Sequence, residues 1–216
     1  AWSADEAWKI KHGGKKGRVF IQGFGCVGAS CAHKLVELGY TIVGVSDALG
    51  VVEDQNGLDI AELIANKNNF GEMDRSKFKP SYKTMPNTDW LNVDCDILIP
   101  AALEDDINKD NAGKVTASLV VEGANIATTA EADEIFKEKG VDVVVDFVAN
   151  LGAVRAYHSV IFGNLEHDGQ AVLDDIEGVC RGNTRKLFET CEKEGMFQRE
   201  AAYKIFEPST SDPFEI

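Results

Sequence analysis

Short apolar runs recur along the first two thirds of the chain, and amphipathic stretches separate them. The runs are rich in valine and isoleucine, which favour β-strands. They occupy residues 18–22, 41–46, 96–100, 119–122 and 141–146. Apolar side chains at helical spacing occupy residues 29–38, 58–66 and 130–139. Strands separated by helices predict βαβ crossovers, and hence an α/β, Rossmann-like, doubly wound and mostly parallel sheet.

The rest of the chain is predicted to form helices, loops and a tail. Helical spacing recurs over residues 152–162, 173–194 and 199–206, with Gly195 as a stop. Residues 3–11 have a helical pattern with Ser3 as the cap, and a capping box over residues 128–131 opens the helix that follows it. Residues 68–92 are polar and irregular, with room for one short strand.

These patterns divide the chain into four parts. Residues 1–17 are a helical and linker lead-in, and residues 18–150 are the dinucleotide-binding Rossmann core. Residues 151–206 are a C-terminal helical segment of the same domain. Residues 207–216, with two prolines and several acids, are expected to be a disordered tail.

A glycine-rich turn joins the first predicted strand to the first long helix. Its residues are Gly23, Phe24, Gly25, Cys26, Val27 and Gly28. In this setting the first glycine permits a tight turn, the second lets the backbone approach a pyrophosphate, and the third lets the helix pack on the strand. Unpaired N–H groups at the helix start favour phosphate oxygens. The alternative is a βα turn that binds nothing.

Asp47 ends the second strand, about 20 residues beyond the glycines, which is the usual place of a ribose-binding acid. Its carboxylate can accept hydrogen bonds from both hydroxyls of an adenosine ribose. A 2′-phosphate would face that negative charge, and no arginine adjoins Asp47 in the sequence. The expected cofactor is therefore NAD, with NADP as the possible second.

Composition excludes several classes of partner. The net charge of −14 disfavours nucleic acid and anionic membranes, and no apolar run is long enough to span a bilayer. The five cysteines form no CxxC pair, and the four histidines show no ligand spacing, so we expect reduced thiols in a cytoplasm and no metal site. The first residues lack a signal peptide and resemble a cut inside a larger protein.

Several motifs together resemble the C-terminal NAD(P)-binding domain of the glutamate/leucine/phenylalanine/valine dehydrogenase family. Within this family, the residues of the motifs are most similar to those of glutamate dehydrogenases. The motifs are residues 21–28 (IQGFGCVG), 45–50 (VSDALG), 94–104 (DCDILIPAALE), 120–125 (VVEGAN) and 146–150 (DFVAN). The resemblance implies hydride transfer between NAD(P) and the α-carbon of an amino acid, with release of ammonia and a 2-oxo acid, and glutamate is the substrate that it favours.

The resemblance also implies a role for individual residues. The Cys26 and Val27 amides would hold the pyrophosphate, and Asp47 the adenosine ribose. Ala101 and Ala102 would line the cofactor cleft. Asn125 and Asn150 would bind the nicotinamide ribose and carboxamide, and both follow apolar strands, where ligands bind in open α/β sheets. The alternative is that each asparagine only caps or turns the chain.

The sequence departs from the family pattern in three places. Ile126-Ala127 stands where the family usually has Gly-Pro, and Leu151-Gly152-Ala153-Val154 replaces Ala-Gly-Gly-Val. Tyr157 stands where glutamate dehydrogenases have a serine that helps bind the substrate carboxylate. Tyr157 is therefore either a substrate residue or a packing residue on its helix.

The family's catalytic lysine and aspartate belong to an N-terminal domain whose motifs are absent here. The lysines at 15 and 16 follow two glycines but directly precede the first strand, so we interpret them as a linker, and we assign no catalytic residue. The substrate, an amino acid or 2-oxo acid, would bind through the missing domain, and the full-length protein would be a homo-oligomer, commonly a hexamer. The competing hypothesis is a non-catalytic NAD-binding sensor or regulatory module.

Cys26 adds a chemical question at the same turn. A helix N-terminus lowers the pKa of a thiol, so an exposed Cys26 would be readily alkylated and protected by NAD. The alternative is a buried and inert side chain that is tolerated because it is small.

Overall fold

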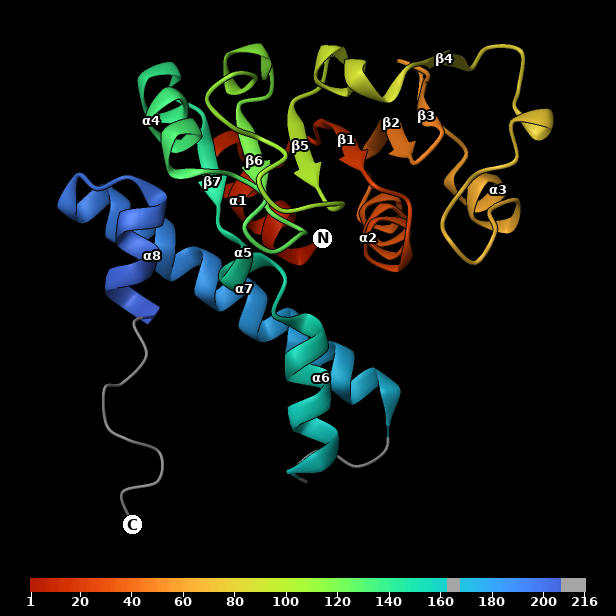
Figure 1. The fold of residues 1–216 in the computed structure, drawn as a ribbon. Helices are drawn as coiled ribbons and strands as arrows, with labels where there is room; N and C mark the ends of the chain where they lie inside the picture. Colours follow the sequence, from red (N-terminus) through yellow and green to blue (C-terminus); the bar gives the residue numbers. More distant parts are fainter. Residues whose placement is uncertain (163–167, 207–216) are drawn as a thin grey trace.

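The computed structural model describes residues 1–162 and 168–206, and within them the centre is a seven-stranded sheet (Figure 1). The strands are β1 (Arg18–Gln22), β2 (Thr41–Asp47), β3 (Gly50–Glu53), β4 (Lys83–Met85), β5 (Ile97–Pro100), β6 (Leu119–Val121) and β7 (Asp142–Val144). Their order is β4-β3-β2-β1-β5-β6-β7. All pairs from β2 to β7 in this order are parallel, and only β2–β3 and β3–β4 are antiparallel. The predicted mostly parallel α/β sheet is confirmed.

Helices lie between and beyond these strands. They are α1 (Trp2–His12), α2 (Cys26–Glu37), α3 (Ile60–Ala65), α4 (Ala130–Lys139), α5 (Asp146–Ala149), α6 (Gly152–Ile161), α7 (Gly169–Glu194) and α8 (Gln198–Phe206). Short 3-10 helices are η1 (Arg75–Lys77), η2 (Asn87–Asn92) and η3 (Ala112–Lys114). None of the described helices combines the length and the apolar character that crossing a membrane requires. The predicted tail, residues 207–216, lies outside the described residues.

Two predicted helix caps are wrong. Ser3 lies inside α1, which begins at Trp2, and the Ser3 side chain is buried rather than bonded to the helix start. Helix α4 begins at Ala130 as predicted, but Thr129, not Thr128, caps it by accepting from the Ala132 N–H at 3.3 Å. Both errors have the same source, because a capping motif fixes a helix start only to within a residue or two.

The order of the strands creates a topological switch point between β1 and β5. From β1 the chain builds outward through β2, β3 and β4, and then crosses back to place β5 on the other side of β1. Ligands of open α/β sheets bind at such a switch point, outside the carboxyl ends of the strands. The ends of β1 and β5 are therefore where a nucleotide site is expected.

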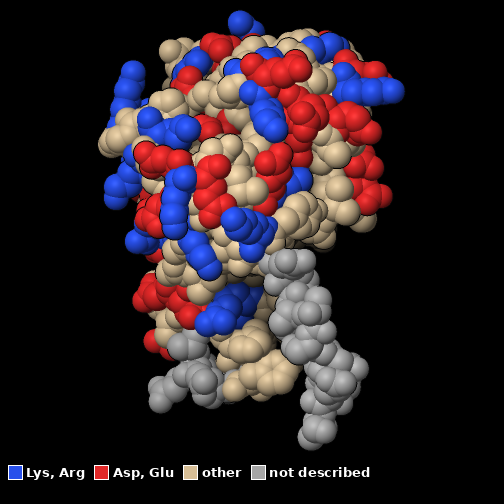
Figure 2. Space-filling model, turned by 90° about the vertical axis from the view of Figure 1, so that its left-hand side faces the viewer, with Lys and Arg blue, Asp and Glu red and all other residues tan. Residues whose placement is uncertain are grey.

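The amino-terminal helix packs on the long helix α7 rather than hanging free. Asp5 of α1 binds Arg181 of α7 at 2.7 Å and Lys16 at 2.6 Å, and Trp8 donates its indole N–H to the Lys15 carbonyl at 2.7 Å. Helix α6 and the start of α7 project away from the sheet (Figure 1). Lysines, arginines and acids are mixed over the face drawn in Figure 2, which shows no continuous basic surface.

Candidate functional site

The glycine turn after β1 is shaped by two close approaches. Gly23 has φ 88°, and a Cβ there would lie 2.7 Å from the Ala101 carbonyl oxygen. A Cβ on Gly28 would lie 1.8 Å from the Gly23 carbonyl oxygen. Side chains at these positions would push the chain away from β5 and push α2 away from the turn. The sequence-based reasons for the first and third glycines therefore match the packing.

The N-terminus of α2 is open to a ligand. Gly25 is the N-cap, no side chain caps the helix, and its first turn holds no acid. A Cβ on Gly25 would meet nothing within 4 Å, and Cys26 and Val27 are exposed. The side chain of Phe24 is buried, which leaves only its main chain for a ligand. Free N–H groups and the helix dipole make this turn suited to a phosphate or pyrophosphate.

The ends of three parallel strands meet beside this turn. The Ala101 N–H donates to the Gln22 carbonyl at 2.8 Å, and the Gly123 N–H donates to the Pro100 carbonyl at 2.9 Å. A Cβ on Gly123 would lie 3.0 Å from that of Ala101. The predicted cleft residues Ala101 and Ala102 therefore lie between the glycine turn and the loop that follows β6; Ala101 is half-buried and Ala102 exposed.

Asn125 and Asn150 are brought together, although 25 residues separate them in the chain. The Asn150 side-chain amide donates to the Asn125 side-chain oxygen at 2.7 Å. Asn150 ends α5 and Asn125 follows β6, so two amide side chains stand together at the carboxyl edge of the sheet. Amides offer both donors and acceptors, as a ribose and a carboxamide require.

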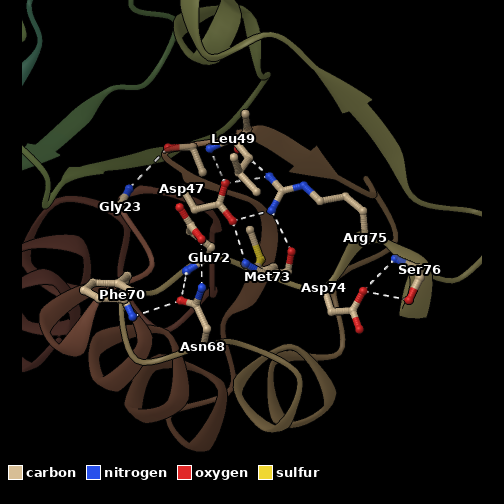
Figure 3. A network of polar contacts seen from close by, with 12 residues as sticks. Gly23, Asp47, Leu49, Asn68, Phe70, Glu72, Met73, Asp74, Arg75 and Ser76 are labelled. Carbon is tan, nitrogen blue, oxygen red and sulfur yellow. Dashed lines mark hydrogen bonds and ion pairs between the residues drawn. The ribbon is translucent and has the colours of Figure 1, made fainter.

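Asp47 does not stand alone at the end of β2 (Figure 3). Its side chain is only 2% exposed and forms a two-pronged ion pair with Arg75, one prong of which measures 2.6 Å. Its oxygens also accept from the Leu49 N–H at 2.8 Å and the Met73 N–H at 2.7 Å. The inference that no arginine adjoins Asp47 is true of the sequence neighbours but wrong in space.

The segment that supplies Arg75 also lies against the glycine turn. A Cβ on Gly71 would come within 2.9 Å of the Gly25 Cα. Asn68 shapes the segment, because its side-chain oxygen accepts from the N–H groups of Phe70 and Glu72 at 2.9 and 3.0 Å (Figure 3). Residues 68–75 therefore pack against both the glycine turn and Asp47, a feature that their polar, irregular sequence did not signal.

Comparison with known proteins decides the family. The sequence model of the glutamate/leucine/phenylalanine/valine dehydrogenases matches residues 3–206 of this chain. The chain belongs to this family. Among solved structures, the hetero-hexameric glutamate dehydrogenase of Thermus thermophilus superposes with a TM-score of 0.78 at 25% identity, over 93% of this chain and 48% of that one. A Plasmodium falciparum glutamate dehydrogenase, at 23% identity and a TM-score of 0.77, supports the fold.

Relatives in the family carry both cofactor names. An NADP-specific glutamate dehydrogenase of Saccharolobus shibatae is 48% identical over 66% of this chain and 33% of its own length. An NAD-specific one of Staphylococcus aureus is 44% identical over 63% and 32%. The glutamate dehydrogenase of Thermotoga maritima is 38% identical over 88% and 46%. The chain thus spans a third to a half of the length of these relatives.

Two departures from the family pattern have structural consequences. Ile126, which stands where the family usually has glycine, adopts φ 50°, a left-handed conformation that is strained for a β-branched residue. Tyr157 on α6 is 68% exposed, so it does not pack into the core of the described residues. The first departure keeps a backbone shape that suits glycine, and the second leaves a phenol free to meet another surface.

A buried ionic network near the asparagines was missed from the sequence. Arg199 of α8 binds Glu122, just after β6, at 2.7 Å, and pairs with Asp133 of α4. Burial raises the pKa of Glu122 and of Asp133 above their usual values, and Arg199 opposes both shifts. Its members lie up to 77 residues apart, so no local pattern could have indicated the network.

Proposed function

We propose that this chain is the NAD(P)-binding part of an amino acid dehydrogenase that oxidatively deaminates an L-amino acid, with glutamate as the favoured substrate. The observation that carries the proposal is the uncapped, acid-free start of α2 at the switch point, with the Asn125–Asn150 pair at the neighbouring strand ends. The names of the matched relatives support the dehydrogenase class and the choice of glutamate.

Each residue has a defined task in this proposal. The N–H groups of Cys26 and Val27 would bind the pyrophosphate, with Gly23, Gly25 and Gly28 keeping the backbone close. Asp47 and Arg75 would meet the adenosine ribose. Bound NAD(P) supplies the hydride acceptor, and Asn125 and Asn150 orient the nicotinamide end toward the substrate side. Ala101 and Ala102 line the cleft with small side chains that leave room for the dinucleotide.

We expect a weaker preference for NAD over NADP than an unpaired Asp47 would produce. The guanidinium of Arg75 neutralises the Asp47 carboxylate and is itself 28% exposed. A 2′-phosphate would therefore meet a cation together with the acid, and Arg binds phosphate in a two-pronged geometry. We expect NAD(H) to bind and NADP(H) to bind with a penalty of less than about tenfold.

Amino acid oxidation needs catalytic groups for which the sequence of this chain shows no motif. Hydride transfer requires a substrate held at reacting distance and a base for the ammonium proton. We place these groups, and the contacts of a homohexamer, in the further length that the relatives possess, and we place the protein in the cytoplasm. The exposed Tyr157 is the candidate contact for the substrate carboxylate from this side.

Isothermal titration calorimetry of the 216-residue chain with NADH, NADPH and ADP tests the proposal. We expect all three to bind, because the glycine turn and the Asp47–Arg75 pair serve the half of the cofactor that they share. Incubation with NAD and glutamate should produce no NADH absorbance at 340 nm. Failure to bind either dinucleotide would refute the cofactor site, and turnover by the chain alone would refute the division of labour.

The second candidate is a non-catalytic NAD-binding module. The replacement of a family serine by the large Tyr157 and of a family glycine by the strained Ile126 favours it. Both hypotheses predict binding of NADH, so the distinction comes from the longer natural protein. If that protein turns over no amino acid while binding NADH normally, the module hypothesis replaces the enzyme hypothesis.

A further inference from the structure

Arg199 connects the C-terminal helix α8 to the middle of the sheet. Its side chain is 15% exposed, whereas its partners Glu122 and Asp133 are 0% and 7% exposed. Two acids at this depth need a cation, because an unpaired buried carboxylate is strongly unfavourable. Among the described ion pairs, Arg199 is the partner of both.

Glu122 connects Arg199 to helix α5. One carboxylate oxygen accepts from Arg199 at 2.7 Å, and the other accepts the Asp146 N–H at 2.8 Å together with a second Arg199 N–H at 3.4 Å. Asp146 is the first residue of α5, so Glu122 fixes where that short helix begins. If Glu122 lost its cation, it would take up a proton or move toward water, and either change would weaken its hold on Asp146.

Asp146 in turn holds the loop that carries Asn125. Its side chain accepts the Ile126 N–H at 2.9 Å, and the Ile126 carbonyl accepts the Asp105 N–H at 2.8 Å. Ile126 is the strained residue of this loop, with φ 50°. Strained conformations persist only where surrounding contacts determine them, and Asp146 provides one of the two contacts here.

The same acid also anchors the second asparagine. The Asn150 N–H donates to the Asp146 carbonyl at 2.7 Å, and the Asn150 side chain donates to Asn125. Both asparagines are therefore held through Asp146, one through its side chain and one through its main chain. A shift of Asp146 would move them together.

We propose that Arg199 is a positioning residue for the nicotinamide end of the cofactor, acting through Glu122 and Asp146 on the Asn125–Asn150 pair. This inference rests on the proposed cofactor role of the two asparagines. It gives helix α8 a task in binding the dinucleotide, although Arg199 itself touches no cofactor. The adenosine half, which we assign to the glycine turn and the Asp47–Arg75 pair, lies outside this chain of contacts.

That separation distinguishes positioning from plain stabilisation. ADP contains the adenosine and diphosphate of NADH but lacks the nicotinamide riboside. If Arg199 only holds α8 against the sheet, its loss changes the affinities for ADP and NADH equally or leaves both unchanged. If it positions the asparagines, NADH loses affinity while ADP does not.

The experiment compares Arg199→Met, Arg199→Lys and the control Lys204→Met by calorimetry with NADH and with ADP. Lys204 lies on the same helix and pairs with Glu194 near the surface. We expect Arg199→Met to raise the Kd for NADH by about tenfold and the Kd for ADP by less than about twofold. The NADH affinity of Arg199→Lys should fall between those of Arg199→Met and the wild type, because lysine keeps the charge without the planar guanidinium. Lys204→Met should change the affinity for neither ligand.

Asp146→Ala removes the side-chain contact with the Ile126 N–H, one step later in the same chain of contacts, and keeps the test decisive if Arg199→Met does not fold. It should show a selective loss of NADH affinity, and the loss in the double variant should be smaller than the sum of the two single losses. Parallel loss of ADP and NADH, or unchanged NADH affinity in a folded variant, would overturn the inference. Absence of NADH and ADP binding by the wild type would instead refute the proposed function.

Discussion

The Asp47 carboxylate is paired with a guanidinium that comes from 28 residues further along the chain. With four donors on its two oxygens, Asp47 has little capacity left for ribose hydroxyls while Arg75 stays in place. We therefore expect the position of Arg75 to decide between a hydroxyl and a phosphate at the 2′ carbon.

Arg75→Gln should shift the chain toward NADH. Loss of the cation removes a charged hydrogen bond to a 2′-phosphate and leaves the Asp47 charge facing it, so the Kd for NADPH should rise by about tenfold or more. The Kd for NADH should stay level or fall, because Asp47 becomes free to accept from the ribose. Titration calorimetry with both ligands gives the ratio.

Lys77→Gln is the matched control for this substitution. It removes one positive charge from the same short helix, η1, at an exposed position. Both Kd values should remain unchanged in this variant. If Arg75→Gln and Lys77→Gln have equal effects, general charge rather than the contact with Asp47 sets the preference.

Cys26 should be the cysteine that is alkylated fastest. It is exposed at the start of α2, so the alternative that its side chain is buried is wrong, and its reactivity stays a prediction. Burial raises the pKa of the Cys95 thiol to about 12 and that of Cys191 to about 11, which leaves almost no thiolate at neutral pH, and burial also raises the pKa of Cys180. Timed iodoacetamide labelling with peptide mass spectrometry ranks the five sites.

NADH should slow the labelling of Cys26 and leave that of Cys191 unchanged. The reason is that the pyrophosphate would cover the first turn of α2, while Cys191 lies on α7. Rapid labelling of Cys26 that NADH does not slow would contradict the position assigned to the pyrophosphate. Slow labelling in both conditions would show that exposure and the helix start do not activate this thiol.

At the scale of an element, the turn into α2 separates a structural glycine from a functional one. Gly28→Ala would place a Cβ 1.8 Å from a backbone oxygen, so it should destabilise the fold by about 1–3 kcal/mol. Gly25→Ala would meet nothing within 4 Å and should leave the unfolding free energy nearly unchanged. Urea unfolding followed by fluorescence measures both.

Gly25→Ala, which should hardly change stability, should weaken the binding of NADH. Gly25→Ala places a methyl group where the pyrophosphate would approach the helix start, so NADH affinity should fall while the fold stays intact. Unchanged NADH affinity in Gly25→Ala would contradict the proposed approach of the pyrophosphate to this turn. Equal destabilisation by the two substitutions would contradict the packing described for Gly28.

The elements that the sequence predicted well are those with strong local patterns. Strand β1 and helix α4 have the predicted bounds, because an apolar run and a periodic helix leave little choice. Strand β3 was missed because it follows β2 through Ala48 and Leu49, which are not typical hairpin residues. Helix α5 was missed because four residues are too few to show helical periodicity.

At the scale of the whole molecule, the candidate site is assembled from segments that only the fold brings together. The glycine turn and the two asparagines could be indicated from the sequence, because motifs and strand ends are local signals. The pairing of Arg75 with Asp47 and the link from Arg199 to Glu122 could not, since long-range ion pairs leave no local pattern.

The most direct test of the account is a map of backbone amide chemical shifts as NADH is added to the 216-residue chain. We predict that the largest changes fall at the glycine turn, Asp47, Ala101 and the Asn125–Asn150 pair. Changes centred instead on the hollow of about 710 Å³ lined by Lys11, Phe188 and Met196, or no changes at all, would contradict the claim that the start of α2 is a dinucleotide site.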